Sequence, residues 1–238
     1  MVKIENRKSQ NENLIELPPW HGEFGWEIMS WAPAARKLAR RYDKVIVTSF
    51  EGMAPLYADF AQFRSHGGTG RSLDYIKNYK PDGEYYRYGR PGECAYQFDV
   101  LIHCRGIRRK SSINYSRWDE LLAITKKMPV TCACIGSQED MRIGGLFDMR
   151  GLELQALMNQ LSAARLVVGV SSGLMHLAAA CGTDIVVWGD TKTRYWETLE
   201  KRYKATWNPF GVRVGWVDAD DWNPDPEQIA NTIKELMQ

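Results

Sequence analysis

The sequence predicts an α/β protein whose strands form parallel sheets. Short apolar runs rich in β-branched residues alternate along the chain with segments of helical periodicity. The run 166–170 (LVVGV) carries no polar side chain, as is typical of a strand buried on both faces of a parallel sheet. Polar residues and glycines directly follow the strands, and the ligands of such sheets bind at the carboxyl ends of the strands.

The first part of the chain is predicted to form one alternation of helix and strand. The expected elements are a glycine-containing loop that leads into a helix within 20–43, a strand over 44–50 and a helix over 54–63. Residues 65–97 are rich in Gly, Tyr, Lys and Pro and show little periodicity, so we expect loops there and a domain boundary near residue 95. The predicted domains are residues 1–95 and 96–238.

Strands and helices alternate more regularly after residue 98. The predicted order is a strand over 100–103, a helix over 116–127, a strand over 130–135, a helix over 152–164, a strand over 166–170, a helix over 174–181, a strand ending at Asp190 and, after a Trp-rich loop, a helix over 226–237. This alternation implies a second parallel sheet.

The composition is that of an ordinary soluble globular protein. Of the 238 residues, 44% are hydrophobic and 25% are charged, and no apolar run is long enough to span a bilayer. The polar N-terminus lacks the apolar core of a signal peptide, so we expect a cytoplasmic protein. The net charge of +2 does not by itself predict a nucleic-acid binder. The local cluster of Arg and Lys within 105–110 keeps that alternative open, beside a phosphate site or a solvated surface.

The five cysteines do not form a metal-binding pattern. Cys132 and Cys134 lie on one face of a predicted strand, and no second Cys or His pair follows at zinc spacing. We therefore expect reduced thiols, no metal site and no cofactor.

The segment that follows the strand 166–170 is predicted to bind an anion. Ser172 can cap the next helix, and Gly173 allows a ligand to approach the backbone closely. The amides of Gly173, Leu174 and Met175 would then point outward at the positive end of the helix dipole. His176 lies one turn into the same helix, where it is either a packed core residue or a further contact to the anion.

This segment resembles one in a known enzyme family. The pattern V-V-G-x-S-S-G-L-M-H-L-A-A-A-C-G-T-x-I-V-V-x-G of residues 167–189 is similar to the donor-binding segment of the heptosyltransferase-like glycosyltransferases, glycosyltransferase family nine. The resemblance implies the GT-B fold of two Rossmann-like domains, here with a reduced N-terminal, acceptor-side domain and a C-terminal domain that binds the nucleotide sugar. It also implies that residues 172–176 hold the diphosphate. The family usually has Asp where this chain has Ser171, which leaves the sugar or leaving group open.

The loop that opens the first helix contains the candidate catalytic base. In the family, an early Asp that lies six residues before a Pro is thought to act as the base, and Glu27 matches that position relative to Pro33. Glu23 and His21 compete for the role, because inverting transfer needs a carboxylate or imidazole near the acceptor hydroxyl. Glu27 could alternatively only favour the helix N-terminus. The acceptor-side residues expected in this loop are Gly22, Gly25 and Trp26.

Further donor contacts are expected at the ends of the other strands. Arg105 follows the strand 100–103, where its guanidinium could stabilise a departing nucleoside diphosphate without a metal. By resemblance, Lys110 is a second cation for this role, Glu139 holds the ribose in preference to Asp140, and Thr191 and Lys192 touch the nucleotide. Solvent-exposed turn residues are the alternative interpretation of the acidic pair.

Together these features predict a GT-B glycosyltransferase that moves a sugar from a nucleoside diphosphate donor to a hydroxyl acceptor. The resemblance implies inversion and independence of metal ions, and the acceptor could be a glycan. Two alternatives share the fold: a nucleotide-sugar epimerase, and a non-catalytic module that binds a nucleotide or a glycan.

Overall fold

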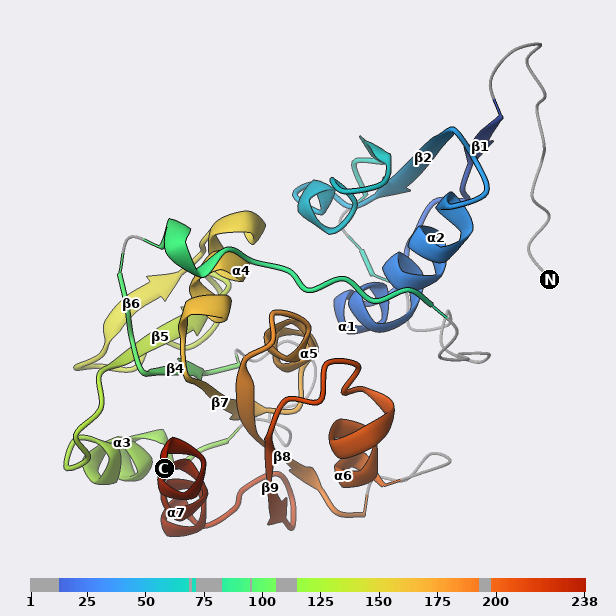
Figure 1. The fold of residues 1–238 in the computed structure, drawn as a ribbon. Coiled ribbons are helices and arrows are strands. Elements are labelled where there is room, and N and C mark those ends of the chain that lie inside the picture. Colours follow the sequence, from blue (N-terminus) through green and yellow to red (C-terminus); the bar gives the residue numbers. More distant parts are fainter. Residues whose placement is uncertain (1–12, 69, 72–82, 95, 106–114, 193–197) are drawn as a thin grey trace. The chain divides into compact units, whose positions relative to one another are not determined.

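The computed structural model describes residues 13–68, 70–71, 83–94, 96–105, 115–192 and 198–238. The chain divides into two compact units, which comprise Met1–Tyr86 (unit 1) and Arg87–Gln238 (unit 2) (Figure 1). The composition of the sequence puts a boundary near residue 95 instead. The assignment of one part to the acceptor and the other to the donor stays a prediction.

Unit 1 contains a small parallel sheet with strand order β1-β2-β3. Its elements in chain order are β1 (Leu14–Glu16), α1 (Phe24–Trp26), the π-helix η1 (Glu27–Trp31), α2 (Ala32–Ala39), β2 (Lys44–Ser49), the 3-10 turn η2 (Ala54–Leu56) and β3 (Gln62–Ser65). The central strand β2 is mostly buried, and Val47 and Ile28 are almost completely inaccessible. The three strands agree with the expectation of a reduced N-terminal Rossmann-like domain.

The helix predicted over 54–63 is wrong. That stretch forms only the turn η2, and residues from Gln62 onward join the sheet as β3, in parallel register with β2. Pro55 occupies the start of the turn, and the fully buried Tyr57 anchors its end. The apolar spacing of the segment fits a helix, but pairing with β2 satisfies the backbone of β3 and decides the outcome.

Unit 2 contains a six-stranded sheet in which all strands are parallel, in the order β6-β5-β4-β7-β8-β9. The strands are β4 (Val100–His103), β5 (Cys132–Gly136), β6 (Phe147–Arg150), β7 (Leu166–Val170), β8 (Asp184–Asp190) and β9 (Val214–Ala219). The helical elements are η4 (Pro91–Glu93), α3 (Trp118–Thr125), α4 (Leu154–Ala163), α5 (Gly173–Ala180), α6 (Leu199–Lys201), the π-helix η6 (Arg202–Thr206) and α7 (Pro226–Met237). No helix within the described ranges is long and apolar enough to cross a membrane.

The strand order of unit 2 is that of a Rossmann fold. The first strand, β4, lies at the centre, and the chain adds β5 and β6 on one side of it and β7, β8 and β9 on the other. The strand order therefore reverses between β4 and β7, which pair directly from Val100↔Leu166 to His103↔Gly169. Ligands of such sheets bind outside the carboxyl ends of the strands at this point.

Helices cover both faces of the large sheet (Figure 1). On one face, Val100 and Val168 pack in a cluster with residues of α3 and α7, including Trp118 and Ile229. Leu101 and other alternate strand residues are equally buried but point to the opposite face. Helix α5 packs on β7 and β8 outside that cluster, so it covers the second face. The strands are thus buried on both sides, as the apolar run 166–170 predicts.

Two strands of unit 2 were not expected from the sequence. Strand β6 (FDMR) and strand β9 (VGWVDA) form the two edges of the sheet, and several of their residues are exposed or half-buried. Neither carries a continuous apolar run, because only one face of each strand and one of its backbone edges meets the rest of the unit. The Trp-rich loop expected before the last helix therefore contains the strand β9.

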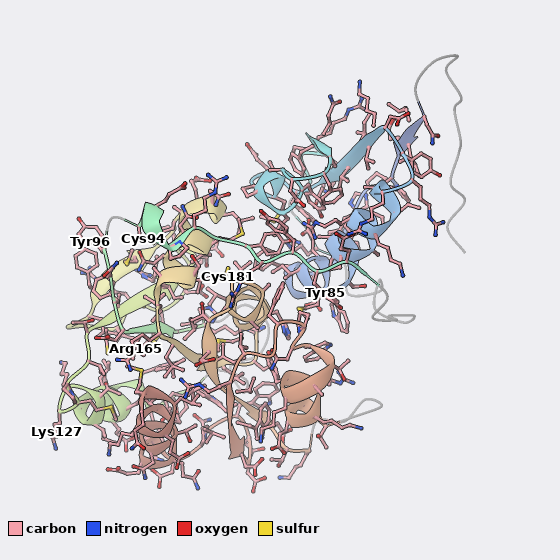
Figure 2. The ribbon with its side chains drawn as sticks, viewed as in Figure 1. Tyr85, Cys94, Tyr96, Lys127, Arg165 and Cys181 are labelled. Atoms are coloured by element: carbon pink, nitrogen blue, oxygen red, sulfur yellow. The ribbon has the colours of Figure 1, made fainter. Side chains whose placement is uncertain are left out.

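All five cysteines are free thiols, as expected. Figure 2 labels Cys94 and Cys181, which lie at separate places in unit 2. Burial raises the pKa of the Cys181 thiol well above its ordinary value, so this group stays protonated at neutral pH.

Candidate functional site

The predicted anion site lies where β7 ends and α5 begins. Ser172 has an extended backbone (φ −160°, ψ 169°), and the helix starts at Gly173. Within the described residues, the amides of Gly173 and Leu174 donate no hydrogen bond. The amide of Met175 donates to the carbonyl of Ser172 at 3.2 Å, so two amides, not three, are available at the positive end of the helix dipole.

The hydroxyl of Ser172 does not cap the helix, which corrects the sequence-based expectation. It lies 3.2 Å from Nδ1 of His103, at the end of β4. The neighbouring Ser171 is held by its amide, which donates to the carbonyl of Trp188, and by a 2.9 Å hydrogen bond between its hydroxyl and Tyr203. Both serine side chains therefore contact elements that are remote in sequence.

His176 is a packed residue, and its contact to an anion stays a prediction. Its half-buried ring stacks on Tyr203 with a centroid separation of 4.9 Å and meets Trp207 edge-on at 4.8 Å. Nε2 lies 3.4 Å from the Tyr203 hydroxyl, while Nδ1 has no partner within the described residues. Burial lowers the pKa of His176 to about 3, so the ring is neutral at neutral pH. It therefore brings no charge to the predicted anion site.

The structure brings Arg105 to the anion site across the point where the strand order reverses. Arg105 follows β4, and its Nη1 donates to the carbonyl of Ser171 at 3.2 Å. A guanidinium thus lies beside the end of β7, as the sequence predicts for a phosphate contact. The second predicted cation, Lys110, lies outside the described residues.

At the end of β5, the acidic residue that points inward is Asp140. Its Oδ2 accepts hydrogen bonds from the amide and the hydroxyl of Ser137, at 2.7 and 3.0 Å, and lies 3.5 Å from Nε2 of His103. Gly136 (φ +140°) makes room for it, because a Cβ there would come within 2.6 Å of the same Oδ2. Glu139, the residue expected to hold a ribose, is exposed in the same turn.

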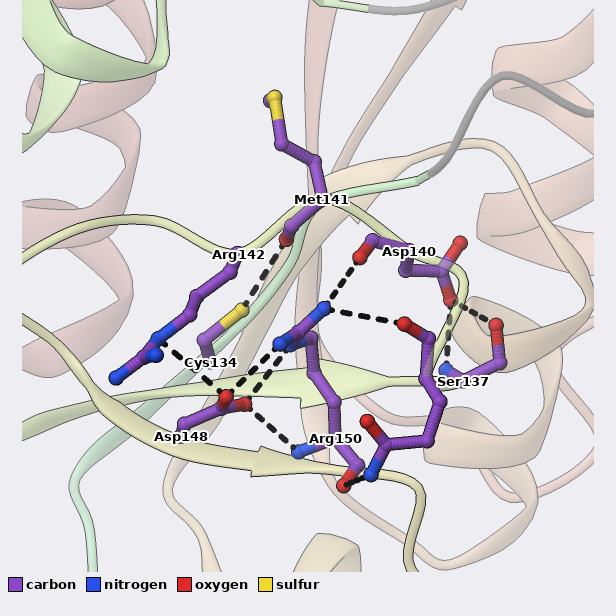
Figure 3. Close-up of polar contacts among 8 residues, drawn as sticks. Cys134, Ser137, Asp140, Met141, Arg142, Asp148 and Arg150 are labelled. Carbon is purple, nitrogen blue, oxygen red and sulfur yellow. Dashed lines mark hydrogen bonds and ion pairs between the residues drawn. The ribbon is translucent and has the colours of Figure 1, made fainter.

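Arg150 fastens the loop that carries Asp140 (Figure 3). Its Nη1 donates to the carbonyls of Asp140 and Gln138, at 2.6 and 3.3 Å. Its other nitrogens form a two-pronged pair with Asp148, at 2.8 and 2.9 Å. These hydrogen bonds from Arg150 lower the pKa of Asp148 to about 2. Arg150 thereby connects the loop after β5 to the edge strand β6.

Thr191 and Lys192 are not brought to α5. They follow β8, but the Thr191 amide donates to the carbonyl of Ala219 at the end of β9, and its hydroxyl lies 3.4 Å from Asp220. The Lys192 ammonium lies 3.7 Å from the same carboxylate. Both side chains are exposed, and their role at a nucleotide stays a prediction.

In unit 1, Glu27 is completely buried and well partnered. One of its carboxylate oxygens accepts from the hydroxyls of Ser49 and Tyr57, and the other accepts from Arg71 at 3.0 Å. Arg71 also donates to the carbonyl of Gly22, so Glu27 and Arg71 together fix the glycine-containing loop. Glu23 is the N-cap residue that precedes α1, and it is half-buried.

The other residues predicted in this loop have mixed surroundings. A Cβ at Gly22 would come within 2.3 Å of the Trp20 ring, so the absence of a side chain there serves internal packing. Gly25 and Trp26 lie in α1 and are half-buried. His21 is exposed, and its ring centroid lies 4.5 Å from that of His66.

Sequence reasoning missed His103 and preferred Glu139 to Asp140. His103 is the last residue of an apolar strand and is only 5% exposed, and Asp140 was ranked behind Glu139. The signal that could have found His103 is its place: a single polar residue that ends the central strand β4 of a parallel sheet.

The described residues offer no obvious metal site. Across the parts of the chain that the structure describes, no three His, Cys, Asp or Glu side chains come together in a group that could hold an ion.

One segment of the chain matches a family model. Residues 149–213, from the end of β6 to just before β9, match glycosyltransferase family 9 (heptosyltransferase). The match includes β7, Ser172 and all of α5. No protein with curated function matches the chain in sequence.

Solved heptosyltransferases share the fold of nearly the whole chain. The dodecameric iron-containing heptosyltransferase TibC in complex with ADP-D-β-D-heptose superimposes with a TM-score of 0.63 and 16% identity, over 99% of this chain and 78% of that one. TibC from enterotoxigenic E. coli H10407 matches with the same TM-score and identity. E. coli ADP-heptose LPS heptosyltransferase II matches with a TM-score of 0.62 and 13% identity, over 94% of this chain and 98% of that one.

Proposed function

We propose that this chain, a heptosyltransferase-like glycosyltransferase of the GT-B fold, transfers a sugar from a nucleoside diphosphate sugar to a hydroxyl acceptor. One observation carries the proposal. The guanidinium of Arg105 lies close to the start of α5, where the amides of Gly173 and Leu174 donate no hydrogen bond within the described residues, at the strand-order reversal of unit 2. One solved heptosyltransferase of similar fold, TibC, is in complex with ADP-D-β-D-heptose, which supports a nucleoside diphosphate sugar as the donor here.

The donor diphosphate would lie against the start of α5. The amides of Gly173 and Leu174 would donate to phosphate oxygens, and the positive end of the helix dipole would favour the charge. Arg105 would approach from the end of β4 and bind a phosphate through two parallel hydrogen bonds. His176 is neutral, so it would add no charge beside the diphosphate.

In the reaction, the acceptor oxygen attacks the anomeric carbon as the bond from that carbon to the diphosphate oxygen breaks. We expect inversion, since attack comes from the face opposite the leaving group. The two electrons of the broken bond go to the nucleoside diphosphate, and Arg105 and the helix amides stabilise the added negative charge. The acceptor hydroxyl gives its proton to a carboxylate.

We assign the role of the base that accepts this proton to Glu23. Glu27 matches the position of the base in the family, but it is 0% exposed, so an acceptor hydroxyl cannot reach it. A base must reach the acceptor hydroxyl, and the half-buried Glu23 is accessible four residues earlier in the same loop. Glu27 then holds the loop in place.

The binding step is tested by a thermal-shift screen of nucleoside diphosphates and their sugars. We expect one base series to raise the melting temperature, because a ligand that binds only the folded state stabilises it. Arg105→Ala should weaken binding by about 10- to 100-fold, since charge-assisted hydrogen bonds are lost. Arg142→Ala, a change at a 68% exposed side chain of the same unit, should leave binding unchanged. The absence of any shift would refute the proposal.

The chemical step is tested with the donor that the screen identifies. Release of nucleoside diphosphate only when an acceptor is present supports transfer. An epimerase would convert the donor without acceptor, and a binding module would release nothing. Glu23→Gln should lower kcat by about 100-fold or more while nucleotide affinity is kept. A kcat loss confined to Glu27→Gln would return the catalytic role to Glu27.

A further inference from the structure

His103 lies between two polar groups on opposite sides of the strand-order reversal. Its Nδ1 is 3.2 Å from the Ser172 hydroxyl at the end of β7, and its Nε2 is 3.5 Å from Oδ2 of Asp140 after β5. The side chains of His103 and Asp140 are 6% and 9% exposed. Asp140, His103 and Ser172 thus form a connected row of polar groups from the loop after β5 to the first residue of the predicted anion site.

Neighbouring residues hold His103 and Asp140 in place. Gly169 on β7 leaves room for the imidazole, because a Cβ there would come within 3.1 Å of the Cβ of His103. Asp140 is held by Ser137 and, through its carbonyl, by Arg150 (Figure 3). Three strands and two glycine positions thus keep the ring beside Ser172.

The protonation state of His103 decides which way the Ser172 hydroxyl donates. The carboxylate of Asp140 favours a proton on Nε2. In the neutral ring Nδ1 is then an acceptor, so the Ser172 hydroxyl donates inward and offers a ligand only lone pairs. In the imidazolium Nδ1 carries a proton and donates to Ser172, whose own hydrogen is free to donate to an anion.

We propose that His103 is a positioning residue of the anion site, and that binding of an anion at Ser172 is coupled to the uptake of one proton from solvent by His103. This rests on the proposed function, because it takes the start of α5 as the site of the donor diphosphate. When His103 is protonated, the Ser172 hydroxyl can donate to the anion and the imidazolium places a positive charge nearby. When the ring is neutral, the hydroxyl donates to Nδ1 and the ring carries no charge.

The charged groups around the ring come from each neighbouring element that the structure describes. Asp140 faces Nε2 from the loop after β5, and Arg150 on β6 reaches the carbonyl of Asp140. Arg105 follows His103 by two residues and contacts the carbonyl of Ser171. A bound anion offsets the positive charge of Arg105 beside Ser171.

Sulfate is the probe that tests the coupling without a nucleotide. It keeps the same charge between about pH 5 and pH 8, where histidine titrates. His176 does not interfere, since burial lowers its pKa to about 3. Sulfate affinity is measured by NMR titration of the backbone amides of Gly173 and Leu174. In the wild type we expect affinity to fall up to tenfold per pH unit once the ring loses its proton.

The decisive variant is His103→Asn, whose side-chain amide can donate to Ser172 at every pH. We expect it to bind sulfate without a pH dependence over this range. His66→Asn, which removes an imidazole from unit 1, is the matched control and should keep the wild-type profile. If His103→Asn does not fold, Asp140→Asn is the second variant: it removes the carboxylate that faces Nε2 of His103, so the wild-type pH profile of sulfate affinity should not be kept.

The proposal is overturned if wild-type affinity does not change with pH, if His103→Asn keeps the wild-type profile, or if sulfate leaves the amides of α5 unperturbed. Its failure is separable from that of the proposed function. Sulfate binding that follows pH can occur in a chain that transfers no sugar, and donor turnover without any pH coupling would refute only the role of His103.

Discussion

Glu27 illustrates how burial ties one carboxylate to its neighbours. No part of it is exposed, and it accepts hydrogen bonds from Tyr57 at 2.8 Å, from Arg71 at 3.0 Å and from Ser49. A buried carboxylate needs such partners, because leaving a charge unpaired in the interior costs several kcal/mol. Arg71 in turn stacks over Phe50, 4.0 Å from the ring centroid. This local set stabilises the loop whatever group does the chemistry.

Replacement of Glu27 by Gln should therefore destabilise the protein. The change keeps the shape of the side chain but leaves Arg71, which is 25% exposed, without its counter-charge. We expect the free energy of unfolding to fall by about 2 kcal/mol. The measurement is denaturant unfolding at neutral pH. Glu23→Gln is the control and should change stability by no more than about 0.5 kcal/mol. Equal stability of both variants would contradict the structural role.

At the scale of elements, the loop between β5 and β6 is fixed by one side chain. Arg150 bonds two loop carbonyls and Asp148, while Arg142 approaches the same Asp148 carboxylate at 3.5 Å (Figure 3). The Arg150 side chain is 11% exposed and that of Arg142 is 68% exposed. Water screens the second pair much more strongly than the first.

The two arginines should differ in their contribution to the loop. We expect Arg150→Met to lower the free energy of unfolding more than Arg142→Ala does, because two carbonyls and a carboxylate lose a donor. Arg142→Ala should lower it by less than about 1 kcal/mol. Hydrogen exchange of the amides of Asp140 and Met141 should accelerate in Arg150→Met only. Equal effects of the two variants would contradict the role of Arg150 in fixing the loop.

At the scale of the whole molecule, two units of unequal size carry different parts of the proposed reaction. Unit 2 has the complete six-stranded order with its reversal between β4 and β7, and unit 1 has three parallel strands. The described residues that we propose to bind the diphosphate lie in unit 2, at the carboxyl ends of β4 and β7. The candidate base, Glu23, lies in unit 1.

A nucleoside diphosphate without its sugar should therefore protect amides of unit 2. We expect slower hydrogen exchange in the residues that end β4 and β7 and in the first turn of α5, because ligand binding stabilises the segments that it contacts. The strands β1, β2 and β3 should exchange as in the free protein. Mass spectrometry of peptides from both units makes the comparison within one sample. Protection that appears in unit 1 alone would place the diphosphate elsewhere.

The sequence by itself determined the parallel sheets, the buried strand 166–170, the helix that follows it to within one residue at each end, and the position of Arg105 after a strand. These are local properties, because apolar runs, glycines and helix starts act within a few residues of each other. The edge strands β6 and β9 were not predicted from the sequence, since half-exposed strands carry no continuous apolar run.

Only the tertiary structure decided what the site residues contact. The Ser172 hydroxyl meets His103, which is 69 residues away in the sequence, instead of capping its own helix. Asp140 points inward instead of Glu139, because Ser137 and Arg150 fix the turn. Glu27 is covered by Ser49, Tyr57 and Arg71. Such pairings depend on strand order and register, and these follow from the burial of whole strands rather than from any short pattern of residues.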